Sequence, residues 1–283
     1  MDAEAPSQDF SALAAEGEAM WAHMRREAEE SLRLDPSLTA LMRGAILDRA
    51  SLEEAVVQRV AARLGASAID ARMIADAFMQ AVGEDETIAA AFRADLAACV
   101  ERDPACGRLI EPLLYFKGFH AIQSARLAHA LWRGRRHDFA YYVQSRASDA
   151  LAADIHPAAR LGKGLFLDHG TGFVVGETAV VDDEVSILHN VTLGGTGKAA
   201  GDRHPKVRRG VMIGAGAKIL GNIEIGACSR IAAGSVVLKP VPPNSIVAGV
   251  PAKVVGTESR TEPARDMDQL LRGLAYDSFD YVI

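Results

Sequence analysis

From residue 155 onward, a large apolar residue occupies every sixth position of the chain. The pattern slips by two residues at Phe173 and is interrupted by residues 194–205. The positions that keep the pattern are Ile155, Leu161, Leu167, Phe173, Val175, Val181, Ile187, Leu193, Val207, Ile213, Ile219, Ile225, Ile231 and Val237. An α-helix places apolar residues every 3.6 positions and a lone strand every two, so neither gives a period of six.

A period of six is typical of a parallel β-helix, in which each hexad forms one short strand and a turn. Three hexads complete a triangular coil, so the thirteen hexads, leaving out the one that the slip overlaps, predict about four coils. Large apolar side chains point into such a prism and small residues fit its corners. Residues 194–205 are rich in Gly and poor in apolar residues. We therefore expect them to form a loop that projects from the prism.

The first 150 residues follow a helical pattern instead. The spacing of their apolar residues predicts several helices, including a helix opened by Pro112 that runs through Trp132 and a last helix over residues 137–151. The expected helix starts and stops are Asp35-Pro36, the capping box Ser51-Leu52-Glu53-Glu54, Gly65, Asp70, the break Arg102-Asp103-Pro104-Ala105, and Arg133-Gly134-Arg135-Arg136.

These patterns predict an α+β protein with three parts. An all-α domain over residues 1–151 precedes a β-helix domain over residues 152–256, and a C-terminal tail follows over residues 257–283. We expect the helical domain to cap the open end of the prism and to support oligomer contacts, although helical packing alone is an equally open interpretation. Because residues 258–268 are polar and charged, we expect the tail to be poorly ordered.

Composition narrows the class of protein. The chain is 49% hydrophobic and 24% charged, which is ordinary for a soluble globular protein, and its net charge of -6 disfavours general nucleic-acid binding. No apolar stretch reaches the roughly 20 residues that span a bilayer, and the N-terminus does not resemble a signal peptide. Cys99, Cys106 and Cys228 form no disulfide or zinc pattern, so we expect a cytosolic protein with reduced thiols.

Residues that can carry chemistry gather at the predicted corners and on the predicted loop. Asp154 and His169 lie at most one coil apart, and a carboxylate near an imidazole fixes its tautomer and raises its basicity. A general base of this kind is the most direct prediction from the pair. We interpret His156 as structural, and His23, His129 and His137 likewise.

At these positions the chain resembles a known family, the serine O-acetyltransferases, which are hexapeptide-repeat acyltransferases. The resemblance is strongest over about residues 100–256. It is carried by Arg102-Asp103-Pro104-Ala105, Leu113-Leu114-Tyr115-Phe116-Lys117-Gly118-Phe119-His120, Asp154-Ile155-His156-Pro157, Leu167-Asp168-His169-Gly170-Thr171-Gly172, Val175-Gly176-Glu177-Thr178, Ser186-Ile187-Leu188-His189-Asn190-Val191-Thr192-Leu193-Gly194-Gly195-Thr196-Gly197 and Gly201-Asp202-Arg203-His204-Pro205-Lys206.

The resemblance implies a left-handed β-helix that transfers acetyl from acetyl-CoA to the hydroxyl of L-serine, in the biosynthesis of cysteine. It implies a general base, His169, oriented by Asp154, with no metal, no cofactor beyond the co-substrate and no acyl-enzyme. It also implies contacts to the serine ammonium and carboxylate, and these would come from Asp103, Asp168, Arg203, His204 and Glu177. A serine hydroxyl is a poor nucleophile, which fits the need for an imidazole base.

Two further sets of residues follow from the resemblance. The backbone of Gly194 and Gly195 is a plausible source of donors for the oxyanion. Coenzyme A would lie in the groove between neighbouring prisms of a homotrimer, or of a dimer of trimers. The residues that we expect to line this groove are Ala215, Gly216, Lys218, Ala233, Gly234 and Lys239. Plain turn geometry and solvated lysines remain an equally open interpretation of this set.

Regulation and a partner follow as expectations. L-Cysteine carries the same ammonium and carboxylate as serine, so it should enter the same site as a feedback inhibitor. The chain ends in an apolar, acidic segment with the C-terminal residue Ile283, which resembles the isoleucine by which these enzymes bind O-acetylserine sulfhydrylase. A free carboxylate on an apolar side chain mimics an amino-acid substrate. Here Val282 replaces the usual glycine and could weaken the fit.

Other readings stay open from the sequence. An acyltransferase for a sugar hydroxyl would keep the prism and the base but lack the amino-acid contacts. A hydratase of the γ-carbonic anhydrase kind would bind zinc through His169, His189 and His204, but their separations of 20 and 15 residues do not match a coil of about 18. Cys228 has no identifiable base beside it to make it an acyl carrier, and a non-catalytic scaffold would not need the paired acid and imidazole groups.

Overall fold

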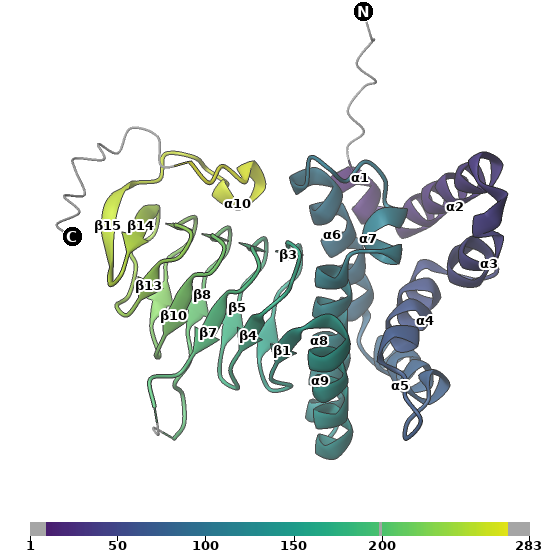
Figure 1. Ribbon diagram of the computed structural model, residues 1–283, viewed down its shortest axis with the longest axis horizontal. Helices are drawn as coiled ribbons and strands as arrows, with labels where there is room; N and C mark the ends of the chain where they lie inside the picture. The colour runs from purple at the N-terminus through teal and green to yellow at the C-terminus, as the bar shows by residue number, and fades with distance from the viewer. Residues whose placement is uncertain (1–9, 198–199, 271–283) are drawn as a thin grey trace, which may run out of the picture.

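The computed structural model describes residues 10–197 and 200–270, with helices at one end of the molecule and a parallel β-helix at the other (Figure 1). The helical end consists of α1 (Phe10–Ala15), α2 (Gly17–Leu34), the 3-10 turn η1 (Pro36–Leu38), α3 (Thr39–Met42), the π-helical turn η2 (Arg43–Leu47), α4 (Leu52–Leu64), α5 (Ala71–Glu84), α6 (Glu86–Arg102), α7 (Ile110–Leu114), α8 (Lys117–Arg133) and α9 (His137–Leu151). No helix within the described ranges is long and apolar enough to cross a membrane.

Side chains cap these helices where the sequence predicts. The Asp35 carboxylate accepts a hydrogen bond from the Ser37 N–H, and the Asp70 carboxylate accepts one from the Met73 N–H. Ser51 Oγ accepts from the Glu54 N–H at 3.2 Å, which satisfies one of the free N–H groups at the start of α4. The predicted starts of these helices are confirmed.

The helix predicted from Pro112 to Trp132 is wrong in one respect, because the chain breaks at Tyr115 and Phe116 and forms the two helices α7 and α8. Both helices bury apolar residues, so the spacing of those residues could not reveal the break. The turn lets the start of α8 press on the prism. A Cβ at Gly118 would lie 1.9 Å from the Leu167 carbonyl oxygen, so only glycine fits there.

Three parallel sheets form the sides of the prism, and we name them faces A, B and C. Face A contains β1 (Ala153–Ile155), β4 (Phe173–Val175), β7 (Thr192–Gly194), β10 (Lys218–Leu220) and β13 (Val236–Val237). Face B contains β2 (Arg160–Leu161), β5 (Val180–Val181), β8 (Lys206–Val207) and β11 (Glu224–Ile225). Face C contains β3 (Phe166–Leu167), β6 (Ser186–Ile187), β9 (Met212–Ile213), β12 (Arg230–Ile231), β14 (Ser245–Gly249) and the antiparallel β15 (Ala252–Thr257).

The strand register confirms the six-residue pattern. Ile155 pairs with Val175, and Leu167 pairs with Ile187, so the repeated apolar residues stack from coil to coil. The predicted number of coils is too low, because face A has five strands. The pattern continues beyond Val237 through a bridge at Val241, four residues on, and then through Val247 of β14, six residues further.

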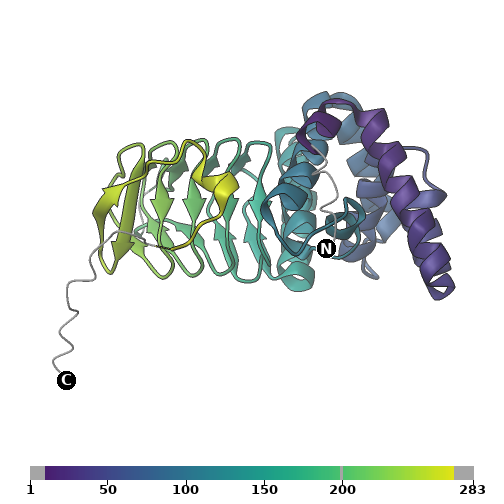
Figure 2. The ribbon, with the colours of Figure 1, turned by 90° about the horizontal axis from the view of Figure 1, so that it is seen from above.

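The residues after β15 also differ from the prediction. Glu258 is buried and its carboxylate lies 3.1 Å from Arg230 Nε. The chain then returns along the prism to the helical domain, where α10 (Pro263–Asp266) lies (Figures 1 and 2). Residues 258–268 are therefore packed rather than poorly ordered. Glu258 and Arg265 pair with Arg230 and Glu184 of the prism, and Arg260 pairs with Asp268 within the segment. The predicted partner-binding residue Ile283 lies outside the described residues.

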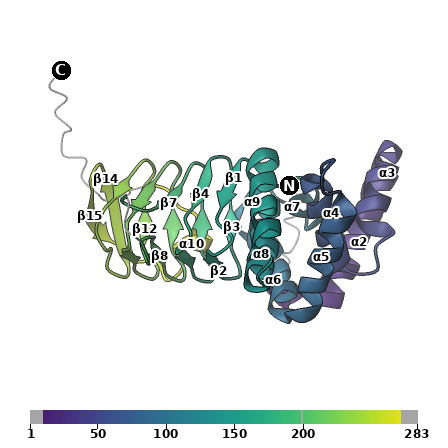
Figure 3. The same ribbon diagram turned by 90° about the horizontal axis from the view of Figure 1, so that it is seen from below.

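The helical domain and the prism meet through α6, α8 and α9, which stand against the first coil (Figure 3). Arg126 of α8 is buried and donates to the Asp95 carboxylate at 2.6 Å and to the carbonyl oxygens of Leu161 and Gly162. Asp95 also accepts from the Leu165 N–H at 2.9 Å. Because each buried charge has a partner, this junction holds the two parts in a defined orientation.

Candidate active site

The candidate site residues on the prism fall mostly at the two long edges of face A. The leading edge consists of the corners that precede its strands, at residues 168–172, 188–191, 214–217 and 232–235. The trailing edge consists of the corners that follow its strands, at residues 156–159, 176–179, 195–205, 221–223 and 238–240. The described residues of the loop, 195–197 and 200–205, project from the prism, as predicted (Figure 1).

The leading edge borders a cavity of about 710 Å³ at the junction with the helical domain. Its lining residues are Asp103, Ala105, Tyr115, Phe116, Lys117, Gly118, Phe166, Leu167, Asp168, His169, Thr171 and His189. The Lys117 amine contacts the Thr171 hydroxyl, so the start of α8 forms one wall of the cavity. The cavity thus brings together three of the predicted site residues, Asp103, Asp168 and His169.

The electrostatics of this cavity favour a bound cation. Burial raises the pKa of the Asp168 carboxyl, the nearby His169 opposes that shift, and the negative charge of Asp103 adds to it. Asp168 Oδ2 lies 3.7 Å from His169 Nε2. The two negative charges repel each other, so an ammonium group placed between them would be stabilised by both carboxylates.

His169 occupies an unusual backbone position. Its φ is +56°, in the left-handed region, and its side chain is 72% exposed toward the cavity side of the corner. The ring contacts that of His189 edge-to-face, with 5.7 Å between the centroids. A separation of 20 residues therefore does match one coil here, because the slip lengthens this coil and Leu167 pairs with Ile187. The expectation that a separation of 20 residues does not match one coil was wrong for this pair.

The trailing edge holds the other predicted contacts. Arg203 Nη2 donates to Glu177 Oε2 at 2.6 Å, and this hydrogen bond lowers the pKa of the Glu177 carboxyl. Thr178 Oγ1 accepts from the N–H groups of Arg203 and His204, at 3.0 and 3.1 Å. A single hydroxyl therefore fixes the end of the projecting loop against the corner of the coil below.

The protonation state of His204 follows from its partners. The Thr178 N–H donates to His204 Nδ1 at 3.1 Å, so Nδ1 is an acceptor and Nε2 carries the proton. Burial, together with the charge of Arg203, lowers the pKa of the His204 imidazole. The ring lies over Gly176, where a Cβ would come within 2.0 Å of Nε2. His204 is a neutral hydrogen-bond donor in a space that only glycine leaves open.

Asp154 lies apart from His169 within one chain. Its carboxylate accepts a hydrogen bond from Gln144 Nε2 of α9 at 2.6 Å. Its charge acts on His156 at the trailing edge, where it opposes the lowering of the pKa of that imidazole by burial. The carboxylate beside His169 in the same chain is that of Asp168. The orientation of His169 by Asp154 therefore stays a prediction.

The expected coenzyme A contacts divide between the edges. Backbone hydrogen bonds from Gly216 to His189 and from Gly234 to Ala215 place Ala215, Gly216, Ala233 and Gly234 in one row with His169 and His189. Lys218 lies on β10, where its amine contacts Asn190. Lys239 follows β13 and lies on the trailing edge with Gly195, whereas Gly194 is the last residue of β7.

Three contributors were not assigned to this site from the sequence, where His189 was considered only as a zinc ligand. His189 and Lys117 line the cavity, and Thr178 organises the trailing edge. The position of His189 could have been found, because it follows Ile187 by two residues as His169 follows Leu167. The contributions of Lys117 and Thr178 depend on contacts between distant segments, and the spacing of residues along the chain does not predict such contacts.

Comparison with known proteins agrees with this arrangement. Residues 20–124 match the family model for the N-terminal region of serine acetyltransferase, and residues 204–239 match the bacterial transferase hexapeptide model. A serine acetyltransferase of Salmonella typhimurium is 46% identical over 264 residues, which cover 93% of this chain and 96% of the relative. The chain belongs to the serine acetyltransferase family.

Solved serine acetyltransferases share the fold as well. The Brucella abortus enzyme in complex with coenzyme A has 58% identity and a TM-score of 0.84, covering 86% of this chain and 97% of its own. A serine acetyltransferase solved in complex with cysteine has 47% identity and a TM-score of 0.87, covering 89% and 98%. The family, fold class and acyltransferase class predicted from the sequence are confirmed.

Proposed function

We propose that this chain transfers acetyl from acetyl-CoA to the hydroxyl of L-serine, giving O-acetyl-L-serine and coenzyme A for cysteine biosynthesis in the cytoplasm. The observation that carries the proposal is the pair of carboxylates, Asp103 and Asp168, that lines one cavity with His169. A neutral sugar offers no cation to this pair, whereas the ammonium of an amino acid fits between them. Family membership supports the same substrate.

In the proposed reaction, His169 takes the proton of the serine hydroxyl as the oxygen attacks the thioester carbonyl. The carbon–sulfur bond then breaks, the acetyl group remains on the serine oxygen, and the proton passes from His169 to the departing thiolate. No bond to the protein forms at any stage. The imidazole is exposed enough to reach substrate, and Asp168 at 3.7 Å stabilises its protonated form.

The site is completed between two copies of the chain. The ammonium contacts lie on the leading edge and the carboxylate contacts, Arg203 and His204, on the trailing edge of the same face. Side-by-side packing of prisms would bring the leading edge of one copy against the trailing edge of the next, beside the strands β1 and β7 that carry Asp154 and Gly194. This arrangement supports a homotrimer, or a dimer of trimers, with coenzyme A in the groove between copies.

L-Cysteine fits the same contacts, because it differs from serine only in a thiol that replaces the hydroxyl. We therefore propose feedback inhibition by cysteine that competes with serine. The relative solved with cysteine supports this proposal. Inhibition that serine concentration does not relieve would contradict a shared site.

The C-terminus supplies the proposed contact with O-acetylserine sulfhydrylase. Residues up to Leu270 are held on the prism, since the Leu270 carbonyl oxygen accepts from Arg230 Nη1 at 2.9 Å. The segment that ends in Ile283 begins directly after this anchor, and its apolar residue and free carboxylate resemble an amino-acid substrate. Deletion of Ile283 should abolish binding to the sulfhydrylase and leave acetyl transfer intact.

The substrate assignment is tested by following thiol release from acetyl-CoA with a panel of acceptors. The panel contains L-serine, D-serine, L-threonine, L-homoserine and glucosamine. We expect L-serine to give the highest kcat/KM, because only its ammonium, carboxylate and hydroxyl match the two edges together. A higher kcat/KM with glucosamine would overturn the assignment.

A further inference from the structure

Asp103 lies on a turn whose conformation is fixed by its own hydrogen bonds. The Asp103 carboxylate accepts from the Ala105 N–H at 2.9 Å, and its carbonyl oxygen accepts from the Cys106 N–H at 2.9 Å. Its own N–H closes the last turn of α6 on Cys99. The side chain therefore moves as one unit with the end of α6, and its place in the cavity depends on what holds that end.

Arg102, the residue before it, is the anchor on the prism. Its side chain is only 1% exposed, although it carries a full charge. Nη2 donates to the Glu184 carboxylate, and Nη1 donates to Ser186 Oγ at 3.0 Å. Ser186 Oγ donates in turn to the Ala264 carbonyl oxygen at 2.7 Å, so the segment around α10 closes over the pair. The guanidinium of Arg102 thus connects the end of α6 to the corner before β6 and, through Ser186, to α10.

Glu184 is itself placed by the fold. It has a φ of +59°, and its N–H donates to the Lys163 carbonyl oxygen at 2.8 Å. A Cβ at Gly164 would lie 2.3 Å from its carboxylate oxygen, so glycine at that position leaves the space that the side chain uses. The acceptor for Arg102 is therefore built into the coil that also carries Asp168.

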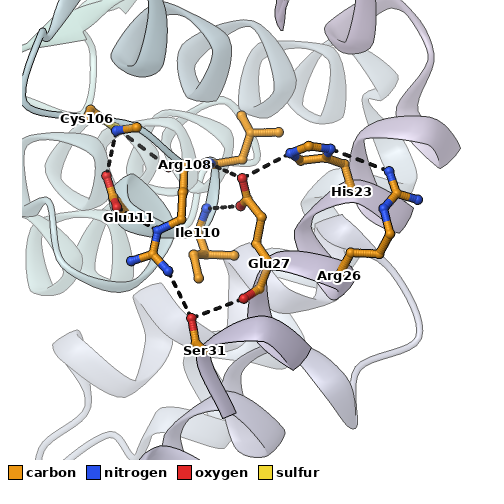
Figure 4. Close-up of polar contacts among 10 residues, drawn as sticks. His23, Arg26, Glu27, Ser31, Cys106, Arg108, Ile110 and Glu111 are labelled. Carbon is orange, nitrogen blue, oxygen red and sulfur yellow. Dashed lines mark hydrogen bonds and ion pairs between the residues drawn. The ribbon is translucent and has the colours of Figure 1, made fainter. Parts of the chain in front are cut away.

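The far end of the same turn is fixed on the helical domain. The carboxylate of Glu27 accepts from the N–H groups of Leu109 and Ile110, at 3.2 and 3.0 Å, at the start of α7. Arg108 Nη1 donates to Ser31 Oγ at 2.9 Å (Figure 4). Held at both ends, the turn leaves Asp103 little freedom of its own.

We propose that Arg102 is a positioning residue for serine binding, which sets Asp103 against Asp168 by fixing the end of α6 on Glu184 and Ser186. This inference rests on the proposed function, because it assigns the two carboxylates to the serine ammonium. Arg102 does not line the cavity, so it acts only through Asp103. A misplacement of about 1 Å can cost a site up to roughly 100-fold in rate, so the anchor has a measurable effect.

The test is Arg102→Lys, which keeps the charge but cannot bind Glu184 and Ser186 together through a planar fork. We expect the KM for serine to rise about 10-fold, within the range expected for a displaced group, while the KM for acetyl-CoA stays unchanged. The matched control is Arg126→Lys, which loosens another buried arginine–carboxylate pair at the same junction of the two domains. The control should lower Tm without raising the KM for serine.

A double-mutant cycle decides whether Arg102 acts through Asp103. In an Asp103→Asn background, Arg102→Lys should raise the KM for serine no further, because the group that it positions is already gone. Glu184→Gln gives the same cycle should Arg102→Lys fail to fold. The inference would be overturned if the two substitutions raised the KM for serine by independent factors that multiply in the double variant. An unchanged KM for serine in Arg102→Lys would also overturn it. Either result would leave the substrate assignment standing. If the wild-type chain did not acetylate serine, both the proposed function and the role of Arg102 would be wrong.

Discussion

Asp103 at the end of α6 and Asp168 at a corner of the β-helix belong to different domains, yet they line one cavity beside His169. Burial, and in addition the negative charge of Asp103, raise the pKa of the Asp168 carboxyl. A bound ammonium group relieves both costs. The recognition of an amino-acid substrate therefore depends on the packing of the helical domain against the first coil.

The first prediction concerns Asp168→Asn. Loss of one charged contact should weaken serine binding by about 2 kcal/mol, or roughly 30-fold in KM, and leave the KM for acetyl-CoA nearly unchanged. Because the pKa of the wild-type carboxyl is raised, it gains its proton at a higher pH than a free aspartate does. The KM for serine should therefore rise as the pH falls through that raised pKa, and the variant should lose this dependence. Equal weakening of both substrates would contradict the assignment.

A second prediction concerns Gly176→Ala, which changes no polar group. The added Cβ would lie 2.0 Å from His204 Nε2, so the imidazole must leave its place at the trailing edge. We expect kcat/KM for serine to fall by about 10-fold or more, as for a displaced positioning group. Gly83→Ala on α5 is the control, because a Cβ there meets nothing within 4 Å, and its activity should match the wild type. Wild-type kinetics in Gly176→Ala would show that His204 has no part in binding serine.

The sequence predicts the prism well because the spacing of apolar residues along the chain is enough to specify it. The spacing of Ile155, Val175 and Leu193 specifies the stacking, since successive coils add 20 and 18 residues and every strand pairs with the next coil. The slip at Phe173 marks the corner that carries His169, so even this irregularity can be located from the sequence. The helix caps at Ser51 and Asp70 are equally local and equally visible.

Contacts between distant segments have no such signal. The charge of the tail predicts poor order, but Glu258 forms an ion pair with Arg230 of the prism. This pair depends on the folded prism, so the sequence of the tail alone does not indicate it. Asp154 lies in β1 and His169 at a corner of the prism, and the number of residues between them does not reveal this separation. The candidate residues could be named from the sequence, whereas their division between two edges could not.

A third prediction concerns stability and rests on His120. Burial lowers the pKa of this imidazole from 6.5 to about 4, and its Nε2 contacts the Leu113 carbonyl oxygen at 2.7 Å. Between these two pKa values, His120 is protonated in the unfolded chain and neutral in the folded chain. The free energy of unfolding that is present above pH 6.5 therefore decreases as the pH falls toward 4. Between about pH 7.5 and pH 5, the loss from this group is about 2 kcal/mol.

Urea unfolding at these two pH values checks the prediction, with His120→Gln as the variant that cannot titrate. The wild type should lose about 2 kcal/mol more than the variant between the two conditions. Equal decreases in the free energy of unfolding of the two proteins would contradict a lowered pKa of His120 in the folded chain.

The central claim is that His169 is the base that activates the hydroxyl of serine. The variant His169→Asn suits the test, because asparagine tolerates the left-handed backbone that this position requires at a φ of +56°. The measurement is the rate of thiol release from acetyl-CoA with saturating L-serine, for the wild type and for His169→Asn. We predict that the variant keeps the wild-type Tm and releases thiol at least about 100-fold more slowly. A folded His169→Asn variant that turns over at close to the wild-type rate would contradict the claim.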